Sequence, residues 1–539
     1  MPAVRCRRTR RDGTAGARGA RQVTAAGAGR ASLALAAAAG AGSVFAFAPF
    51  GYAGVAIVML ALLFGLWQVA ATPRAAAELG FAYGLGLFGT GSSWVYIALN
   101  TFGGMPLVVA VVGTAIWSAY LALFPALVGW IATRWTSPQA WGRAVAAAGL
   151  WTVAELLRGT GYTGFPWLAL GHAQLPVAGG GLESPLAGYA TLGGTWLVTL
   201  AVALCAALLA VAIDAFAAPS RRRGMACLAA IAAIAGGGFA AGRVEWTVPA
   251  GPPVTVSLVQ GNVPQDVKFE SDMREATLQL YLDLAEQSRG RLIVLPESAF
   301  PMFADEVPDR VLMHLQRIAG DRGGDALAGV FTTDPPLPGS TDIRYYNSVV
   351  SLGSNEIQLY RKRHLVPFGE TIPLEPVVGW FIRSVLSIPL ANQTSGDASQ
   401  RPMALAGQRV AVDICYEDAF GGELRRHAAE ATLFVNVTND AWYGRSLAAE
   451  QHNQISAMRA LEAGRPMLRA TNTGITSAID HHGREMARLP WYTRGILEIE
   501  VTGRQGVTPY VRWGDALPAL AALLVAALGF AAGRRQAPR

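Results

Sequence analysis

The chain has 539 residues, of which 52% are hydrophobic and only 15% are charged, and this composition is too apolar for an ordinary soluble protein. The formal net charge is +7, and residues 1–30 alone hold eight arginines against one aspartate, so eight minus one accounts for the whole excess. No basic domain is left to bind nucleic acid, and we expect no nucleic-acid partner. The arginine-rich tail is expected to be a disordered cytoplasmic flank.

Eight apolar segments approach the ~20 residues that are needed to cross a bilayer. They are Ala31–Phe50, Gly51–Ala70, Glu78–Leu99, Pro106–Ala132, Arg143–Leu157, Tyr189–Ala217, Met225–Ala241 and Leu517–Ala532. We therefore divide the chain into a tail (1–30), seven spans (31–242), a catalytic domain (243–513), an eighth span (514–533) and a second tail (534–539). A competing interpretation of the N-terminus is a cleaved signal peptide ending at Ala48, but immediate continuation into further spans favours a retained helix.

The arginines predict the orientation of these spans. One set of connections and the C-terminal tail carry Arg74, Arg134, Arg143, Arg221, Arg222, Arg223, Arg534, Arg535 and Arg539. The opposite connections, Ala48–Tyr52 and Asn100–Met105, carry no lysine or arginine. This positive-inside pattern predicts cytoplasmic termini and places the region between the seventh and eighth spans outside the cytoplasm.

The outer connection Arg158–Gly188 is unusually long and begins with the aromatic residues of an interfacial belt. Arg158 at its start is either a contact for a lipid phosphate or an arginine that snorkels from a helix end. His172 has no partner at a metal-ligand spacing and is expected to be a loop histidine.

From about Arg243 to Trp513 the pattern becomes that of a soluble α/β domain. Strands are predicted at Val254–Gln260, Leu292–Leu295, Leu327–Thr332, Ser348–Leu352, Ile357–Tyr360, Val410–Ile414, Leu433–Val437, Met467–Ala470 and Thr476–Asp480. Helices are predicted at Asp272–Gln287, Pro308–Ala319, Glu423–Glu430 and Leu447–Ala463. Strands first alternate with helices and then pair as hairpins, which predicts two sheets sandwiched between helices.

The same region contains no dinucleotide fingerprint and no phosphate loop. His452 stands alone in the sequence, and the adjacent His481 and His482 fall in a predicted turn. We therefore expect no cofactor and no bound metal.

Three apolar runs of this region end in groups with catalytic chemistry. Arg291–Glu297 ends in a carboxylate, Ile357–Lys362 ends in an amine, and Val410–Asp418 carries the thiol of Cys415. Because buried strands commonly end where a site begins, these groups can converge on one substrate. Taken singly, each also has an ordinary structural explanation, such as a buried thiol or a solvated strand end.

Together they suit acyl transfer. A thiol is a strong nucleophile only as the thiolate, so Glu297 is the candidate base for Cys415. Lys362 would favour the thiolate and stabilise the oxyanion that forms on the attacked carbonyl. The backbone N–H of Tyr416, directly after the thiol, is a second candidate donor to that oxyanion.

These residues resemble those of the nitrilase superfamily of carbon–nitrogen hydrolases. The matching segments are L-P-E-S at Leu295–Ser298, Y-R-K-R-H-L-V-P-F-G-E at Tyr360–Glu370 and D-I-C-Y-E at Asp413–Glu417. With spans on both sides, the chain resembles the bacterial apolipoprotein N-acyltransferase family. That narrower match is supported by V-Q-G-N-V-P-Q, Y-N-S, N-V-T-N-D-A-W-Y-G, R-A-L-E-A-G-R-P and G-F-P-W. The resemblance implies a multi-pass membrane bundle and an α-β-β-α sandwich domain.

The resemblance also implies an activity. Cys415 would take an acyl chain from a phospholipid, typically phosphatidylethanolamine, and pass it to the amine of the diacylglyceryl cysteine of an apolipoprotein. Glu297 and Lys362 complete the implied catalytic triad. Two further family glutamates map onto Glu370 and Glu417, of which Glu370 could hold Lys362 while Glu417 tunes the thiolate or binds the amine. Asn347 is expected among their hydrogen-bond partners, and the protein is expected to act as a monomer.

Substrate contacts are expected from aromatic residues. Thr371–Gly396 is apolar and carries Trp380 and Phe381, which favours a lid or arm that dips toward the bilayer, or else a loop packed on the domain core. Phe269 and Trp442 are further candidates, although Phe269 stands where the family commonly has tryptophan.

Two rival functions remain at this point. A membrane-anchored nitrilase-type amidase would resolve the thioester with water instead of an amine. A transporter with an inactive accessory domain would show broken helices with ionisable groups inside the spans, and few are present in the sequence.

Overall fold

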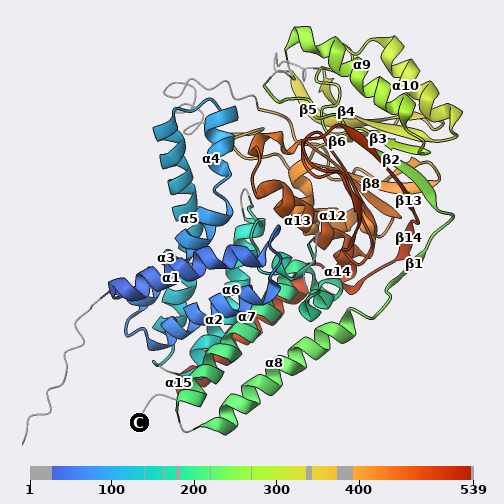
Figure 1. The fold of residues 1–539 in the computed structure, drawn as a ribbon. Coiled ribbons are helices and arrows are strands. Elements are labelled where there is room, and N and C mark those ends of the chain that lie inside the picture. The colour runs from blue at the N-terminus through green and yellow to red at the C-terminus, as the bar shows by residue number, and fades with distance from the viewer. Residues whose placement is uncertain are drawn as a thin grey trace, which may run out of the picture.

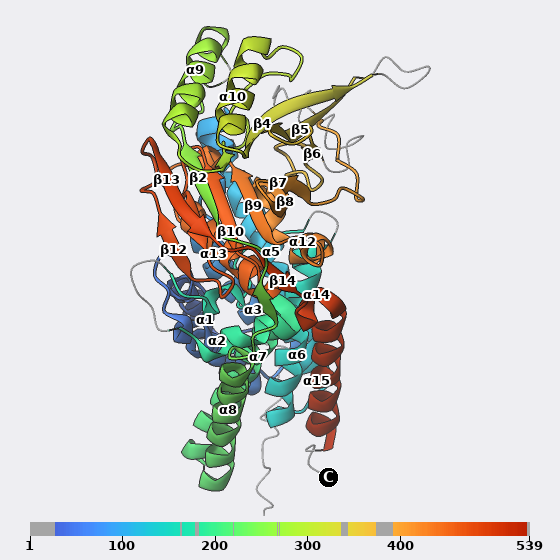
Figure 2. The same cartoon turned by 90° about the vertical axis from the view of Figure 1, so that its right-hand side faces the viewer.

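The computed structural model describes residues 27–535, except 139, 162–163, 178–182, 219, 267, 269, 336–342 and 373–391. A helical bundle is formed by the residues before 242 and by the last helix, and a domain of two sheets lies against it (Figure 1). Figure 2 shows that α6, α8 and α15 all extend away from the strands on the same side.

The bundle contains nine named helices among the described residues. They are α1 (Arg30–Gly42), α2 (Ala53–Val69), α3 (Pro73–Gly91), α4 (Val95–Ile97), α5 (Leu107–Arg134), α6 (Trp141–Thr160), α7 (Ala190–Ala217), α8 (Arg221–Ala241) and α15 (Ala516–Arg535). By length and composition, four helical stretches of the described chain could cross a membrane, at Leu107–Arg134, Pro185–Ala217, Arg221–Ala241 and Ala516–Arg534. The apolar helices Arg30–Ala46 and Ala53–Val69 are shorter, so the count of eight spans stays a prediction.

Helix α6 is less apolar because it buries charge inside the bundle. Arg143, Glu155 and Arg158 are each at most 5% exposed. Arg143 Nη1 donates to the carbonyl oxygens of Trp67 (2.8 Å) and Ala70 (3.0 Å), at the C-terminal end of α2. Arg143 was predicted in a cytoplasmic connection, and the structure adds that its side chain is buried there. Its guanidinium satisfies backbone groups that a helix end leaves unpaired.

Small residues let the bundle helices approach closely. A Cβ on Gly84 of α3 would lie 2.6 Å from Ala122 Cα of α5, and one on Gly149 of α6 would lie 2.5 Å from Ala526 N of α15. Glycine at these crossings therefore serves backbone-to-backbone packing.

The soluble domain contains two six-stranded sheets. The first has the order β13 (Gly495–Val501), β2 (Val254–Gln260), β3 (Leu292–Val294), β4 (Asp325–Asp334), β5 (Arg344–Gly353), β6 (Leu359–Arg361). The second has the order β12 (Glu485–Arg488), β11 (Ser477–Ile479), β10 (Met467–Thr471), β9 (Leu433–Thr438), β8 (Gln408–Ile414), β7 (Met403–Leu405). The central strands β2–β3–β4 and β8–β9–β10 run parallel, and the outer strands are antiparallel.

Alternation along β3 explains the layers of the sandwich. Leu292 and Val294 share a buried cluster with residues of the second sheet such as Val412, whereas Ile293 belongs to a separate cluster with α9 (Ser271–Gln287) and α10 (Asp309–Asp321). Both faces of the strand are buried, which is why the sequence reads as a continuous apolar run. Helices α9 and α10 form the outermost layer in Figure 1.

The predicted strands and helices all exist, with boundaries that differ by a few residues. The sequence analysis missed the short strands β1 (Thr247–Pro249), β7, β12 and β14 (Arg504–Gly506), as well as β13. Strand β13 pairs with β2 over seven residues in antiparallel register, so it forms one edge of the first sheet. Its alternating glutamates Glu498 and Glu500 face away from the core. They interrupt the continuous apolar run by which the other strands were predicted.

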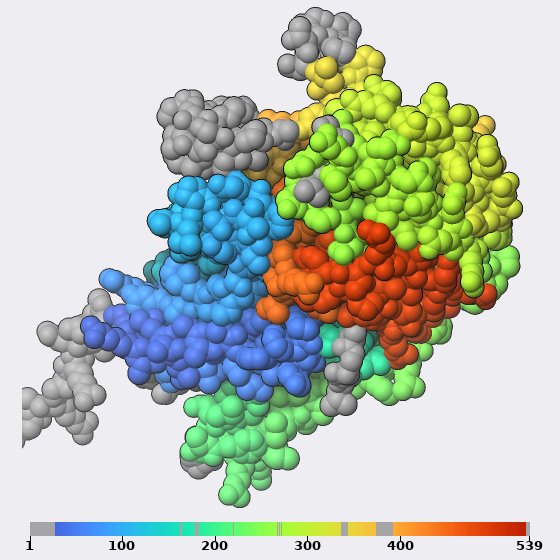
Figure 3. Space-filling view, turned by 45° about the horizontal axis from the view of Figure 1, so that its top comes forward, coloured from blue at the N-terminus to red at the C-terminus, as the bar shows by residue number. Residues whose placement is uncertain are grey.

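Helix α13 (Ala448–Ala463) joins the domain to the bundle, and it is buried on all sides. Gln451 accepts hydrogen bonds from the indoles of Trp94 (3.2 Å) and Trp167 (2.8 Å). Glu462 accepts from the backbone N–H of Thr195 (2.6 Å), just after α7 breaks at Gly194. Figure 3 shows the early helices in blue packed directly against the domain.

Candidate active site

The predicted catalytic residues lie at the ends of three strands. Glu297 and Lys362 follow β3 and β6 of the first sheet, and Cys415 follows β8 of the second. Their exposed fractions are 7%, 1% and 5%. The fold therefore brings a carboxylate, an amine and a thiol from distant parts of the chain to the space between the sheets.

The backbone of Cys415 is held in an unusual conformation at the start of the 3₁₀ turn η6 (Cys415–Ala419). Its φ of +54° is in the left-handed region, which a residue with a Cβ adopts only where its surroundings impose it. Asn436 Nδ2 donates to the Cys415 carbonyl oxygen at 3.0 Å, and His452 Nε2 lies 3.3 Å from the same oxygen. Strain at a thiol is typical of functional sites.

Glu297 and Lys362 belong to one group of polar contacts with Glu370 and Asn347. Lys362 Nζ donates to Glu370 Oε1 at 2.8 Å and lies 3.6 Å from Glu297 Oε1. Asn347 Nδ2 donates to Glu297 Oε1 at 2.7 Å. Glu370 also accepts from the backbone N–H of Val366 at 2.8 Å, so the residue that holds the lysine is itself fixed.

The charges of this group define its resting state. Burial raises the pKa of Cys415 well above that of a free thiol, the Glu297 carboxylate raises it further, and Lys362 lowers it. Burial would lower the pKa of Lys362, but Glu370 and Glu297 raise it above its ordinary value. At neutral pH the site therefore contains a neutral thiol near a permanent cation, and that thiol needs a base.

Lys268 is a buried residue that the sequence analysis missed. Its Nζ donates to the Glu297 carbonyl oxygen at 3.1 Å, and burial lowers the pKa of Lys268 to about 8. It therefore helps to fix the backbone that carries the candidate base. A single lysine in a polar loop resembles a solvated surface residue, and only its place in the V-P-Q-D-V-K segment could have drawn attention to it.

Glu417 joins the strand end that carries the thiol to the one that carries the lysine. Its Oε2 accepts from the backbone N–H of Ile414 (2.7 Å), and its Oε1 accepts from those of Arg363 (2.7 Å) and His364 (3.1 Å). The Tyr360 hydroxyl donates to both oxygens. Burial raises the pKa of Glu417 to about 7 against the lowering effect of the backbone donors. These contacts give Glu417 a positioning role.

Tyr416 ties the thiol turn to the membrane bundle. Its hydroxyl donates to the Gly164 carbonyl oxygen at 2.8 Å, and its ring stacks on Trp167 with centroids 6.1 Å apart. Arg158 Nη1 donates to the carbonyl oxygens of Phe165 and Trp167. Arg158 is therefore a buried anchor of the G-F-P-W loop, which neither sequence-based alternative described.

A buried ionic network lies behind the thiol, and the sequence analysis missed it as well. His452 contacts Asp418 through Nε2 and Asp440 through Nδ1, both at 2.8 Å. Arg469 Nη1 lies 2.8 Å from the second oxygen of Asp418. Burial lowers the pKa of His452, but the two carboxylates raise it to about 9. The spacing of these residues in the sequence gives no hint of the cluster.

Of the four predicted substrate contacts, the structure describes Trp442. Phe269, Trp380 and Phe381 lie outside the described residues. Trp442 is 42% exposed, and its ring meets the edge of Phe102 at a centroid distance of 6.0 Å.

Comparisons with known proteins agree with the division into two parts. The model described as "Apolipoprotein N-acyltransferase N-terminal domain" matches residues 39–208, and that described as "Carbon-nitrogen hydrolase" matches residues 255–509. The apolipoprotein N-acyltransferase of Nitrosomonas europaea is 47% identical over 495 residues, which are 91% of this chain and 96% of that protein. Those of Methylococcus capsulatus and Ralstonia nicotianae are 43% and 41% identical, covering 87% and 91% of this chain and 90% and 91% of theirs.

The chain belongs to the apolipoprotein N-acyltransferase family. The predicted resemblance and the predicted fold class, a membrane bundle with a nitrilase-like domain, are thereby confirmed. The chain is accordingly an acyltransferase and a membrane protein of a bacterial family, and the amidase and transporter alternatives are not favoured.

A small cleft of about 30 Å³ lies beside the Tyr416 contact, on the bundle side of that contact. It is lined by Trp117, Tyr120, Leu121, Leu157, Arg158, Gly161, Gly164 and Phe165. Tyr120 and Leu157 are at least half exposed, so the cleft opens at the surface of the bundle. Gly164 belongs both to this lining and to the contact with Tyr416.

Proposed function

We propose that the chain moves a fatty acyl group from a phospholipid to the amine of the diacylglyceryl cysteine of apolipoproteins, through a thioester on Cys415. The observation that carries the proposal is the buried Cys415 thiol in the electrostatic environment of the Lys362–Glu297 pair, whose charged atoms lie 3.6 Å apart. Family membership supports the two substrate classes.

In the first step Cys415 Sγ attacks the carbonyl carbon of the acyl ester while Glu297 takes the thiol proton. Lys362 stabilises the negative charge on the carbonyl oxygen, together with the backbone N–H of Tyr416. The ester C–O bond then breaks, Glu297 returns the proton to the leaving alkoxide, and a lysophospholipid departs.

In the second step the neutral amine of the acceptor attacks the thioester carbonyl. Glu297 takes a proton from the amine, the C–S bond breaks, and the Cys415 thiolate recovers the proton. The products are an amide and the original thiol, so both steps use one base and one cation. Because Glu370 and Glu297 raise the pKa of Lys362, the cation persists through both steps.

A phospholipid and a lipid-modified protein must both reach Cys415 from the membrane. The acyl donor is proposed to be phosphatidylethanolamine. The cleft at Arg158 and Tyr120 supports entry of a lipid from the side of the bundle. The segment around Trp380 and Phe381 remains a proposed lid over the acyl chain, with Phe269 and Trp442 as further contacts. The protein is proposed to act as a monomer.

The catalytic domain is proposed to lie on the periplasmic side of the inner membrane. Arg74 at the start of α3, Arg134 at the end of α5 and Arg221 at the start of α8 mark one set of helix ends. The other ends of α3 and α8 lead toward the domain, through the Gly91 contact with Gln451 and through β1. Arginine-rich ends favour the cytoplasm, which supports periplasmic chemistry and cytoplasmic termini.

The proposal is tested by mass spectrometry of purified protein after incubation with phosphatidylethanolamine that carries a labelled acyl chain. The expected result is an acyl adduct on Cys415 and its absence in Cys415→Ser. Cys205→Ser and Cys227→Ser are matched controls, because both thiols are buried in membrane helices, and their adducts should match the wild type. After apolipoprotein is added, the label should become amide-linked. Release of free fatty acid instead would identify a hydrolase and refute the proposal.

A further inference from the structure

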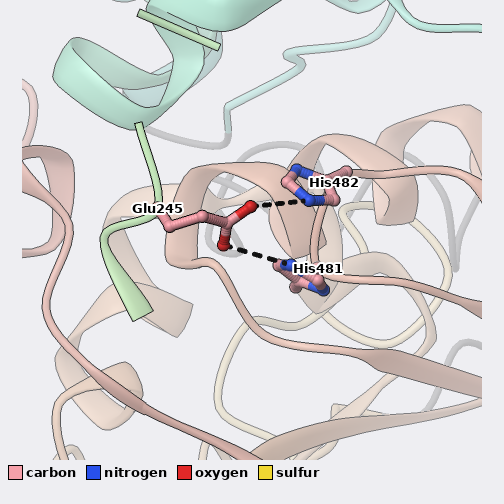
Figure 4. A group of neighbouring side chains, drawn as sticks. All are labelled: Glu245, His481 and His482. Carbon is pink, nitrogen blue, oxygen red and sulfur yellow. Dashed lines mark ion pairs between the residues drawn. The ribbon is translucent and has the colours of Figure 1, made fainter. Parts of the chain in front are cut away.

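A cluster of two histidines and one glutamate lies outside the candidate active site. Glu245 is in the segment that leads from α8 to β1, and His481 and His482 occupy the turn between β11 and β12 (Figure 4). The sequence analysis expected no bound metal, because the two adjacent histidines fall in a predicted turn and no cysteine or further histidine is near them in the sequence. The third ligand comes from a segment more than two hundred residues earlier in the chain.

The geometry of the three side chains is that of a partial coordination shell. Glu245 Oε1 lies 3.1 Å from His482 Nε2, and Glu245 Oε2 lies 3.5 Å from His481 Nε2. One ligand atom from each residue can be chosen so that all lie within 4.8 Å of one another. Tetrahedral zinc with bonds of about 2.0–2.1 Å separates neighbouring ligand atoms by about 3.3–3.4 Å. The 3.1 Å between Glu245 Oε1 and His482 Nε2 is close to that value. The 3.5 Å separation joins His481 to the other oxygen of the same carboxylate.

The residues around the cluster fix the carboxylate of Glu245 and the turn that carries the two histidines. Arg504 Nη2 holds Glu245 Oε2 at 2.9 Å, which fixes the carboxylate and leaves Oε1 directed at His482. The Asp480 side chain accepts from the backbone N–H groups of His482 and Arg484, both at 2.9 Å, so the turn is fixed too. The carboxylates of Glu245 and Asp480 and the guanidinium of Arg504 together carry a net charge of about −1, which favours a divalent cation.

We propose that Glu245, His481 and His482 bind one divalent transition-metal ion, with Zn²⁺ as the ion of choice and water completing the coordination. Two imidazoles and a carboxylate suit zinc better than magnesium or calcium, which prefer oxygen ligands. The ion links the segment that leaves the membrane helix α8 to a turn of the catalytic domain. It therefore holds the helical bundle and the domain of two sheets together.

The test uses the full chain in detergent, purified with an affinity tag that contains no histidine. Protein is stripped with EDTA, dialysed against ZnCl2 and then against buffer, and its metal content is measured by mass spectrometry. We expect about one zinc per chain for the wild type, and at least about tenfold less for the double variant His481→Ala/His482→Ala and for Glu245→Gln. Cobalt(II) should give the intense visible absorption of a four-coordinate site in the wild type, but not in the double variant or in Glu245→Gln.

His314→Ala is the matched control, because His314 also lies beside a glutamate, Glu286, at 2.7 Å on the protein surface. Its zinc content should equal that of the wild type. Zinc should also raise the midpoint of thermal unfolding of the wild type and of His314→Ala, but not of the double variant. Equal zinc in the wild type and the double variant, or less than about a tenth of an ion per wild-type chain, would overturn the proposal. The Cys415 acyl adduct is expected to form in every variant, which separates this test from that of the catalytic proposal.

Discussion

Replacing Glu417 with glutamine should break the link between the thiol and the lysine. The native carboxylate accepts three backbone N–H groups, from Ile414 through one oxygen and from Arg363 and His364 through the other. A glutamine has one oxygen, so at least one buried N–H must face an NH2 group. The least costly orientation gives up the Ile414 contact, which lies directly before Cys415.

The magnitude follows from that count. One buried donor left without an acceptor costs about 1–3 kcal/mol, and the penalty is larger if the amide forces Arg363 or His364 away. If the cost appears as a displaced Cys415 or Lys362 in the transition state, then every 1.4 kcal/mol slows acyl loading about tenfold. We therefore expect Glu417→Gln to load roughly 10–100 times more slowly and to unfold at a lower temperature.

The assay is the rate of acyl-adduct formation on Cys415, measured together with the thermal unfolding midpoint in detergent. Glu423→Gln is the matched control, because Glu423 contacts His364 of the same loop at 3.1 Å but its side chain is 30% exposed. That variant should keep loading and stability closer to the wild type, since a partly exposed ion pair contributes about 1 kcal/mol and Cys415 lies outside this contact. Wild-type loading by Glu417→Gln would refute the positioning role.

Two further predictions concern the surroundings of the thiol. The carboxylates of Asp418 and Asp440 raise the pKa of the buried His452 to about 9. Its contribution to stability is therefore complete below about pH 6.5 and is lost as the pH rises through about 9. His452→Gln should remove up to ~3 kcal/mol of the pH dependence of the unfolding free energy between these two values, as measured by thermal unfolding. Gly164→Ala should impair both stability, by about 1–3 kcal/mol, and acyl loading. Gly164 has a φ of +56°, and a Cβ there would lie 2.5 Å from the Phe420 ring. Unchanged unfolding and loading in this variant would contradict the role of the loop.

Local patterns were sufficient for the elements and for the three groups that the structure brings together at Glu297, Lys362 and Cys415. Apolar runs such as Val410–Ile414 specify buried strands whatever surrounds them, because both faces must leave water. The carboxylate, the amine and the thiol each follow such a strand, so they meet when the three strand ends lie side by side. The motifs around Glu297, Lys362 and Cys415 are contiguous in the sequence, so the family could be recognised from them.

Contacts between distant segments were not accessible in this way. Lys268 looks solvated, His452 looks isolated, and Arg143 looks like a charged flank until the fold buries each of them. A buried charge is stable only beside its partners, and those partners come from other segments of the chain. The sequence therefore determined the family and the groups that are candidates for the chemistry. The tertiary structure alone decided how they are held, because burial and hydrogen-bond geometry depend on where separate strands and helices meet.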